Sequence, residues 1–466
     1  MAGLDFVIRG GEIVNAEGSV RADIGIAGGI IVQIGGEMSA ERELDAHGKL
    51  LFPGGIDAHV HLRSQPATSD EPIWVDDFTT GSAAALAGGV TTVGNMTYIP
   101  PEETLLAGLA RETAAASEQA IADFFLHPII INPTPELLDE IPQLLSIGCN
   151  SMKMFMVMPQ FDEQVSGYLE ATRRAGANGI VSLIHCEDHS LIEDATAQLT
   201  AAHHTALCYF PESRPVLSEV VATQRAVAFA EATNSPVYIV HLSSQRALEV
   251  CAEAQSRGVP VYVETRPLYL HLTSERFQEE DGAKYVGQPP LREQHDAEAL
   301  WAGIQQGTIH TVCTDHAPWM LKDKLDPELD IKKLRPGVEN LQMMLPMLYS
   351  EGVRTGRISA SRFVEVTATN AAKLFGLYPR KGTIAVGSDA DIVVFDPELT
   401  REVENSMLKS NADYSVYEGW SVTGWPVTTI RRGEVVYQED EVIGAPGSGK
   451  LVMRGQTQAD TLKAAK

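Results

Sequence analysis

The sequence predicts an α/β fold, with a parallel (β/α)8 barrel in the middle of the chain and a small β domain formed by its two ends. Three observations support this prediction. Strand-like and helix-like segments alternate through the middle, both ends are rich in short strand-like segments, and residues that bind metals follow the central strands. The chain has 466 residues, and a barrel of this kind takes roughly 250 or more as one unit.

The two ends of the chain have the same strand-and-turn character. Short runs rich in Val and Ile, separated by glycine turns, are typical of β-strands. These runs cover residues 6–11, 13–15, 30–36, 391–396 and 428–436. Two all-β segments at opposite ends most simply form one domain. We therefore expect 1–52 and 381–466 to build it together, with the barrel over 53–380.

The middle of the chain has apolar, β-branched runs that alternate with helical segments. Near-continuous apolar strands are typical of parallel sheets covered on both faces. These strands are expected at 91–95, after a helix at 79–87, and at 180–184, 237–240, 261–263 and 310–313. The active site of such a barrel lies at the C-terminal ends of its strands, and the metal-binding residue types mostly fall there.

Composition limits the classes of partner and the compartment. Hydrophobic residues make up 44% of the chain and the formal net charge is −26, so nucleic acids and anionic membranes are excluded as partners. The five cysteines are scattered and lack CxxC spacing, which predicts no disulfide framework and a cytoplasmic protein. We expect neither a signal peptide nor a transmembrane span.

His59 and His61 are the first candidate metal ligands. They lie two residues apart just after the run 55–57. Residues i and i+2 of a strand point to the same face, so both imidazoles can reach one metal ion. The alternative is a pair of structural histidines inside the barrel.

Lys153 stands inside an apolar run of Met and Phe. Burial of a lysine is costly unless it is paired or neutral, and a low-dielectric site lowers its pKa. A free amine can add CO2 to give a carbamate, whose negative charge can bridge two cations. The alternative is a lysine on an edge strand whose amine reaches solvent.

His185 and His241 each end a strand-like run, and Asp315 lies just beyond the last one. Taken singly, each has a structural alternative: a histidine packed at a strand end, or a carboxylate that caps a helix. Together with the two earlier histidines and the lysine, they make a ligand set for two divalent ions. A carboxylate at this place can accept a proton from water and return it to a leaving nitrogen.

Nine motifs in order along the chain resemble those of one family. They are PGGIDAHVH (53–61), KMFM (153–156), HCED (185–188), SRP (213–215), HLSS (241–244), ETRPLYL (264–270), PPLR (289–292), DHAP (315–318) and GSDAD (387–391). As a set they resemble the cyclic amidohydrolases of the amidohydrolase superfamily, the group of hydantoinases, dihydropyrimidinases and allantoinases.

The resemblance implies a TIM barrel with a composite β-sandwich, a homotetramer or homodimer, and a small-molecule substrate. It implies two zinc ions bridged by a carboxylated Lys153, with manganese or cobalt as substitutes. His59 and His61 would hold the more buried ion, the other two histidines the second, and Asp315 would be both ligand and base. The implied reaction is hydrolysis of a hydantoin-type or dihydropyrimidine-type ring by a bridging hydroxide, giving an N-carbamoyl amino acid.

The chain departs from this family at three positions that we expect to line the pocket. Met158 stands where these enzymes usually have a Tyr, five residues after the lysine, that helps to stabilise the oxyanion. Gln288 precedes Pro-Pro in place of Ser or Asn. Arg266 begins Arg-Pro-Leu where Cys-Pro-His or Cys-Pro-Gln is usual.

Two arginines leave a second substrate class open. Arg63 follows His61 by two residues, as in dihydroorotases, where an arginine there holds a substrate carboxylate. Arg266 is a second candidate anion contact. The alternative function is therefore an allantoinase-like or dihydroorotase-like hydrolase of an anionic ring, although either arginine could be merely structural. Trp74 and Trp319 would form an apolar rim or pack on the surface.

A non-enzymatic scaffold is the remaining alternative, because some relatives of this family have lost their ligands. That alternative predicts missing histidines or lysine at the ligand positions. All six candidate ligands are present in this chain, which favours an enzyme.

Overall fold

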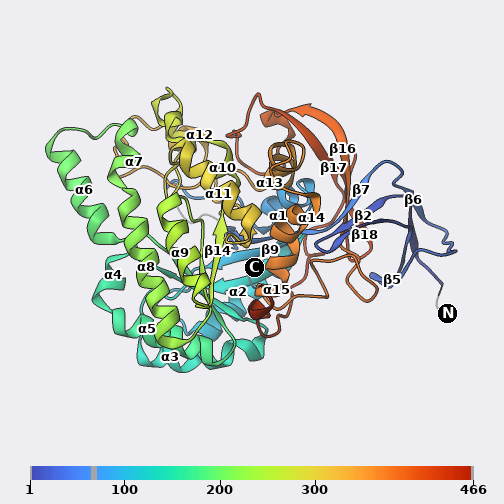
Figure 1. The fold of residues 1–466 in the computed structure, drawn as a ribbon, viewed down its shortest axis with the longest axis horizontal. Helices are drawn as coiled ribbons and strands as arrows, with labels where there is room; N and C mark the ends of the chain where they lie inside the picture. Colours follow the sequence, from blue (N-terminus) through green and yellow to red (C-terminus); the bar gives the residue numbers. More distant parts are fainter. Residues whose placement is uncertain (1–2, 65–70, 463–466) are drawn as a thin grey trace.

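The computed structural model describes residues 3–64 and 71–462. Figure 1 shows long helices packed around a set of central strands, with a β-rich domain at one end of the molecule. Blue N-terminal strands and orange C-terminal strands lie together in that domain. The predicted α/β class is thus confirmed.

The central strands are parallel and pair in sequence order. They are β8 (Gly55–Val60), β9 (Val90–Thr97), β10 (Asp123–Pro128), β11 (Ser151–Phe155), β12 (Val181–His185), β13 (Val237–Ile239), β14 (Val261–Thr265) and β15 (Thr311–Val312). They form one sheet of order β10-β9-β8 and another of order β11-β12-β13-β14-β15. Bridges between Ile129 and Lys153, and between Val60 and His316, link the two sheets on both sides.

The helices are α1 (Phe78–Ala87), α2 (Leu105–Gln119), α3 (Pro135–Glu140), α4 (Pro159–Glu163), α5 (Val165–Ala177), α6 (His189–Ala201), α7 (Phe210–Ser213), α8 (Val216–Thr233), α9 (Gln245–Ser256), α10 (Pro267–His271), α11 (Gln294–Gln306), α12 (Leu321–Lys324), α13 (Met344–Leu348), α14 (Ala360–Val364) and α15 (Asn370–Leu374). Local sequence explains where several begin. Asp77 caps α1 through the backbone N–H groups of Thr79 and Thr80, and Ser244 caps α9, which satisfies donors that a helix leaves free.

Short 3-10 and π-helical segments complete the helical part. The 3-10 turns are η1 (Ile141–Ile147), η2 (Leu207–Tyr209), η3 (Ser274–Gln278), η4 (Gly282–Tyr285), η7 (Asn405–Met407) and η8 (Ala459–Thr461). Two π-helical turns, η5 (Tyr349–Val353) and η6 (Glu365–Thr369), continue α13 and α14. Within the described residues, no helix is both long and apolar enough to cross a membrane.

The β domain contains strands from both ends of the chain. They are β1 (Phe6–Arg9), β2 (Glu12–Asn15), β3 (Gly18–Arg21), β4 (Ile24–Ala27), β5 (Ile30–Ile34), β6 (Glu43–Asp45), β7 (Leu50–Pro53), β16 (Ile392–Glu402), β17 (Ser421–Arg431), β18 (Glu434–Gln438) and β19 (Glu441–Val442). One sheet has the order β5-β4-β1-β6 and the other β19-β18-β17-β16-β7-β2-β3. Strand β7 joins the two ends, because it pairs with β2 on one side and β16 on the other.

The segment 428–436 differs from the prediction of one continuous strand. It contains the end of β17, a turn, and the start of β18. Arg432 and Gly433 have φ of 48° and 75°, a left-handed conformation that glycine adopts without strain. The turn folds the segment into a hairpin.

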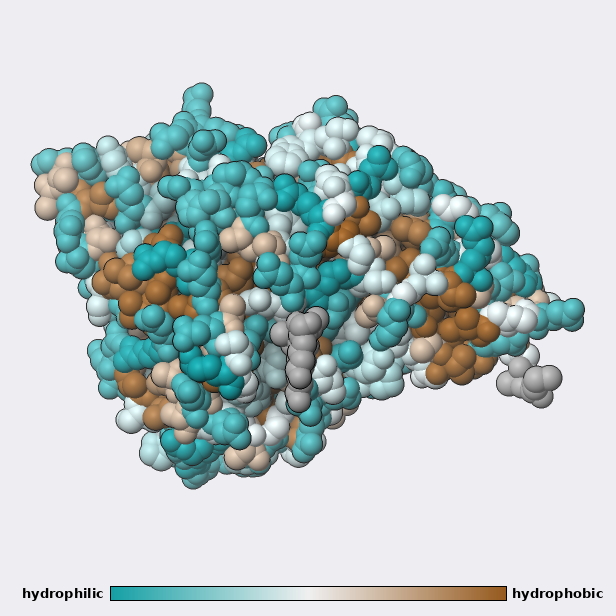
Figure 2. Space-filling model, viewed as in Figure 1, coloured by the Kyte–Doolittle hydropathy of each residue, from teal (hydrophilic) through white to brown (hydrophobic). Residues whose placement is uncertain are grey.

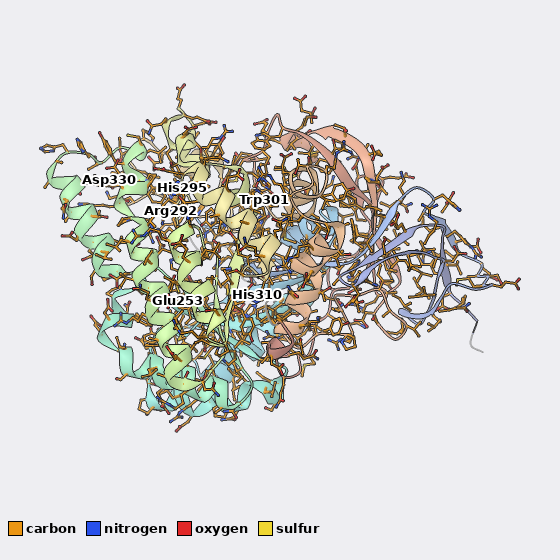
Figure 3. All side chains as sticks on the ribbon, in the orientation of Figure 1. Glu253, Arg292, His295, Trp301, His310 and Asp330 are labelled. Atoms are coloured by element: carbon orange, nitrogen blue, oxygen red, sulfur yellow. The ribbon has the colours of Figure 1, made fainter. Side chains whose placement is uncertain are left out.

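Side chains fill the interior of both parts. Figure 3 shows this packing, with Trp301 on α11 and His310 just before β15 among the labelled residues; both are buried. Figure 2 shows a surface that is largely hydrophilic on this face, interrupted by apolar patches over the helical part and the β domain.

Candidate metal centre

The six candidate ligands lie at the same ends of the parallel strands. His59 is the second-last residue of β8, and His61 directly follows that strand. Lys153 is in β11 and His185 is the last residue of β12. The remaining two, His241 and Asp315, lie just beyond β13 and β15.

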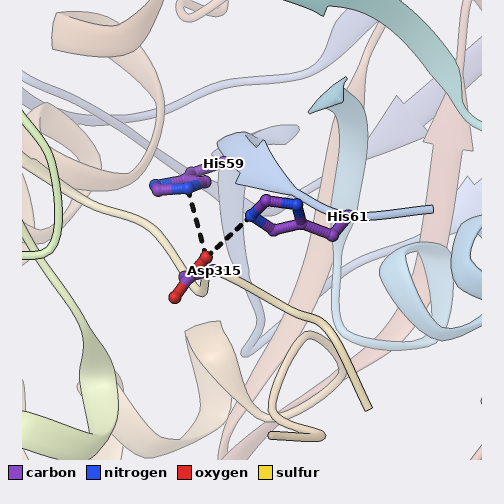
Figure 4. Close-up of side chains that lie close together, drawn as sticks. All are labelled: His59, His61 and Asp315. Atoms are coloured by element: carbon purple, nitrogen blue, oxygen red, sulfur yellow. Dashed lines mark ion pairs between the residues drawn. The ribbon is translucent and has the colours of Figure 1, made fainter. Parts of the chain in front are cut away.

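Asp315 brings the first two histidines together. Its Oδ1 atom lies 3.1 Å from His59 Nε2 and 3.1 Å from His61 Nε2 (Figure 4). All three side chains are largely withdrawn from solvent. Their donor atoms are close enough to hold one metal ion.

His185 and His241 lie next to this group. Their ring centroids are 4.5 Å apart, and the His241 ring is 5.4 Å from that of His59. Lys153 is fully buried, and its Nζ has no hydrogen-bond partner among the described residues. Its charge acts against protonation of all four histidines, after burial, although the pKa of His59 is raised overall by the nearby carboxylates.

The backbone is strained at two of the candidate ligands. His241 and Asp315 have φ of 40° and 52°, in the left-handed region that non-glycine residues rarely adopt. Buried carboxylates hold the backbone there. Glu264 accepts from the His241 N–H at 2.9 Å, and Asp57 accepts from the Thr314 N–H. Strain of this kind concentrates at functional sites.

Two buried glutamates orient the histidine rings. His59 Nδ1–H donates to Glu264 Oε1 at 2.8 Å, and His185 Nε2–H donates to Glu187 Oε2 at 2.8 Å. Arg214 holds Glu187 through two further hydrogen bonds. Such carboxylate partners fix which ring nitrogen faces a metal. Sequence reasoning assigned no role to these glutamates, although both stand in the motifs around the strand ends.

Burial controls the protonation of the site. It lowers the pKa of Lys153 to about 8 and that of His61 to about 4. It also holds the pKa of His241 well below its ordinary value. Burial raises the pKa of Asp315, but the charges of His59 and Arg266 outweigh it and keep that pKa well below its usual value. These groups offer neutral imidazole and anionic carboxylate donors, the forms that bind metals.

A cavity of about 170 Å³ opens onto the candidate ligands. Met158 and Gln288 line it, as their sequence positions predict, and Trp74 and Tyr98 form another part of the wall. Trp319 is not among the lining residues but packs against Trp74, with the two ring centroids 6.4 Å apart.

Neither predicted anion contact is among the described residues that line this cavity. Arg266 is fully buried, pairs with Asp315 Oδ2 at 3.2 Å and donates to the Thr314 carbonyl. Arg63 donates its backbone N–H to the Asp76 carbonyl. Their contact with an anionic substrate stays a prediction. The local sequence could not reveal that Arg266 turns towards Asp315, because the two lie far apart along the chain.

The profile of the amidohydrolase family matches residues 50–436. The chain belongs to the amidohydrolase family. This amidohydrolase is 38% identical over 458 residues to a D-hydantoinase of Ralstonia pickettii, covering 97% of this chain and 99% of the relative. It is 36% identical over 454 residues to a D-phenylhydantoinase of Escherichia coli O7:K1, covering 96% and 98%. The resemblance inferred from the nine motifs is therefore confirmed.

Solved structures agree with the sequence relatives. A D-hydantoinase (dihydropyrimidinase) from Thermus sp. superposes with a TM-score of 0.92 at 33% identity, over 97% of this chain and 100% of that one. A dihydropyrimidinase from Brevibacillus agri NCHU1002 superposes with a TM-score of 0.90 at 34% identity, over 97% and 99%.

The amidohydrolase family implies a binuclear centre of divalent metals, and the residues of this chain fit one. The donor set is rich in imidazole, which suits zinc and similar ions. Lys153 Nζ and His241 Nδ1 are buried without hydrogen-bond partners among the described residues. Buried polar atoms are normally paired, so these orphans indicate that the protein alone does not complete the site.

Proposed function

We propose that this amidohydrolase opens a cyclic amide of the hydantoin or dihydropyrimidine type and releases an N-carbamoyl amino acid. One observation supports this above all: five candidate ligands carried by four different strands or the residues just after them line one small cavity, and the sixth, Lys153, is buried in the neighbouring strand β11. Relatives named D-hydantoinase and D-phenylhydantoinase, which match almost the whole chain, support the choice of ring.

We propose two divalent ions, preferably zinc, as the cofactors. His59, His61 and Asp315 would hold one, His185 and His241 the other, and a carboxylated Lys153 would bridge them. When bound, such ions polarise a carbonyl and make water acidic enough to attack it at neutral pH.

Asp315 is the proposed base and acid of the reaction. Its Oδ1 atom faces the two histidines, while Arg266 holds its Oδ2 atom. A carboxylate fixed in this way can accept the proton of the attacking water and return it to the departing ring nitrogen. Burial of the surrounding side chains keeps bulk water from competing for that proton.

The finer fold follows from the same pairings. We propose a closed (β/α)8 barrel over residues 53–380 and a composite β-sandwich made from 1–52 and 381–466. The bridges on both sides of the parallel sheets support closure. An apolar layer that includes Phe6, Ile26 and Ile392 supports the sandwich.

An anionic ring of the allantoinase or dihydroorotase type is the less favoured alternative. None of the described residues that line the cavity is Arg or Lys, so the wall offers no fixed positive charge for a substrate carboxylate. A non-enzymatic scaffold is not favoured, because every candidate ligand is present and five of the six line the cavity.

Turnover of a ring panel with metal analysis of the same sample tests the function. The panel contains hydantoin, 5-phenylhydantoin, dihydrouracil, dihydroorotate and allantoin. We expect two metals per chain and turnover of hydantoins or dihydrouracil. Turnover confined to dihydroorotate or allantoin would favour the anionic-ring alternative. Asp315→Asn is the matched control, since it should keep the fold and abolish any turnover that belongs to this site.

We also propose a cytoplasmic homotetramer or homodimer. The five cysteines are free, which suits a reducing compartment. Light scattering of the purified enzyme measures its mass in solution.

A further inference from the structure

Trp74 lines the substrate cavity and has an unused hydrogen-bond donor. Its ring lines the cavity and lies 4.9 Å from the His61 ring and 6.3 Å from the Tyr98 ring. The Nε1 atom is buried, and it has no hydrogen-bond partner among the described residues. A buried N–H group without an acceptor costs free energy relative to its hydrated state.

Three other tryptophans of this chain pair their indole donors with backbone carbonyls. Trp301 Nε1–H donates to the Leu270 carbonyl at 3.1 Å. The indoles of Trp319 and Trp425 donate to the carbonyls of Pro336 and Val422 at 2.8 and 2.9 Å. Trp74 differs from these three because its donor is unpaired and its residue lines the cavity. An acceptor that arrives with a ligand would pair it.

The position of Trp74 indicates which ligand atom it meets. Trp74 packs against His61, and Asp315 Oδ1 is 3.1 Å from His61 Nε2. The leaving ring nitrogen must face Asp315 to receive its proton. In hydantoins and dihydropyrimidines this nitrogen is bonded to the urea carbon, so the urea oxygen projects towards the same side of the cavity.

We propose that Trp74 Nε1–H donates a hydrogen bond to the urea carbonyl oxygen of the bound ring, which makes Trp74 a substrate-binding residue. This inference rests on the proposed function, because only a cyclic ureide carries that oxygen next to the leaving nitrogen. The indole is a neutral donor and suits an uncharged carbonyl. Met158, on the same cavity wall, has no donor to offer.

The test combines one substitution in the protein with one in the substrate. Trp74→Phe removes the N–H and keeps an aromatic ring, and 2-thiohydantoin replaces the urea oxygen with sulfur, a weaker acceptor. On hydantoin we expect Trp74→Phe to lower kcat/KM by about 5- to 50-fold with unchanged metal content. The sulfur substitution should lower the kcat/KM of the wild type much more than that of the variant. The reason is that both changes remove the same hydrogen bond.

Trp301→Phe is the matched control. It also removes a buried indole N–H, but one that pairs with backbone outside the cavity, so it should lower the melting temperature and leave kcat/KM within about twofold of the wild type. A kcat/KM equal to that of the wild type for Trp74→Phe on hydantoin would overturn the proposal. So would an equal fold-loss of kcat/KM from the sulfur substitution in the wild type and in the variant.

The wild type provides a measurement that does not depend on the folding of a variant. Equal kcat/KM on hydantoin and 2-thiohydantoin, after correction for their uncatalysed hydrolysis rates, would also overturn the proposed contact. If the wild type opens no cyclic ureide at all, the proposed function fails first and this inference fails with it. The two failures are therefore distinguishable.

Discussion

At the scale of single residues, two buried lysines show how differently the chain uses the same side chain. Lys324 Nζ donates to the carbonyls of Val286 and Gly337 at 2.8 and 2.5 Å. Lys153 Nζ has no such partner among the described residues. Burial lowers the pKa of both amines. Only Lys153 combines an unpaired amine with neighbouring imidazoles, which is the setting that a bridging carbamate needs.

Replacing Lys153 tests that role. Lys153→Ala should lose at least one metal ion and nearly all activity, and short carboxylic acids should restore part of it by taking the place of the carbamate. Metal content by mass spectrometry and turnover on the same sample measure both effects. Lys324→Met is the control, and we expect lower stability with both metals retained. Full metal and full activity in Lys153→Ala would exclude the carbamate bridge.

Glu339 gives a pH dependence of stability. Burial raises its pKa to about 7, against the opposing charge of His316, from an ordinary value of 4.5. The folded protein therefore binds more protons than the unfolded chain between about pH 4.5 and 7. Stability from protonated Glu339 is present at low pH and is lost as the pH rises through this window.

Glu339→Gln should remove this loss. Relative to the wild type, the variant should gain about 2.5 kcal/mol in its free energy of unfolding between pH 5 and pH 8. Urea unfolding of both proteins at the two pH values measures the difference. If the two proteins show the same pH dependence, Glu339 is ionised in the folded state.

At the scale of elements, strand β7 anchors the helical part to the β domain. Its Phe52 is buried, and the ring lies 5.0 Å from that of Phe363 in α14 and 5.3 Å from that of Phe395 in β16. Three elements thus meet at one aromatic side chain. A cavity there would weaken contacts of all three.

Phe52→Ala should lower the free energy of unfolding by about 3–5 kcal/mol, the usual cost of truncating a buried aromatic. Chemical denaturation measures it. Val20→Ala in β3 is the control, because that valine is exposed and its loss should change stability by less than about 0.5 kcal/mol. A similar change for both variants would show that Phe52 does not join the elements.

Sequence reasoning succeeds for elements whose signal is local. The runs before His185 and His241 are apolar and β-branched, and both form buried strands. It fails where two residues reverse the chain. The apolar run 428–436 looks like one strand, but Arg432 and Gly433 turn it, and β-branched residues on both sides hide that signal.

At the scale of the whole molecule, a buried charge cluster ties the central sheet to the C-terminal segment. Lys381 contacts Asp123 of β10 at 2.8 Å and also pairs with Asp389 and Asp391. Arg432 pairs with Asp123 as well. The three carboxylates lie close enough together to hold a metal ion, but the Lys381 amine already neutralises them.

Lys381→Met should leave these carboxylates without their central cation. Breaking one side of a buried ion pair typically costs about 3–5 kcal/mol, and we expect a loss of this size in thermal or urea unfolding. Lys49→Met removes the more exposed pair with Asp396 and should cost less than about 1 kcal/mol. Equal losses would show that the cluster does not stabilise the joint between the two parts.

The sequence predicts the candidate ligands better than their surroundings. The C-terminal ends of parallel strands meet at one face of a barrel, and this general rule brings His59, Lys153 and Asp315 together. It needs only the local strand pattern. The contact of Arg266 with Asp315 joins residues 49 positions apart, and those of Glu264 with His59 and of the charge cluster with strand β10 join residues more than 200 apart. No local pattern specifies such contacts, and only the folded chain shows them.

The pairing of β7 with β16 has a consequence for synthesis. Residues 50–53 leave the ribosome early, but their partners at 392–395 follow about 340 residues later. At about 5–20 residues per second, β7 waits roughly 20 to 70 s for that neighbour. During this interval the nascent chain exposes an unpaired apolar strand edge, which invites pairing with other chains. Production of this enzyme should therefore respond to chaperone supply and to the speed of translation.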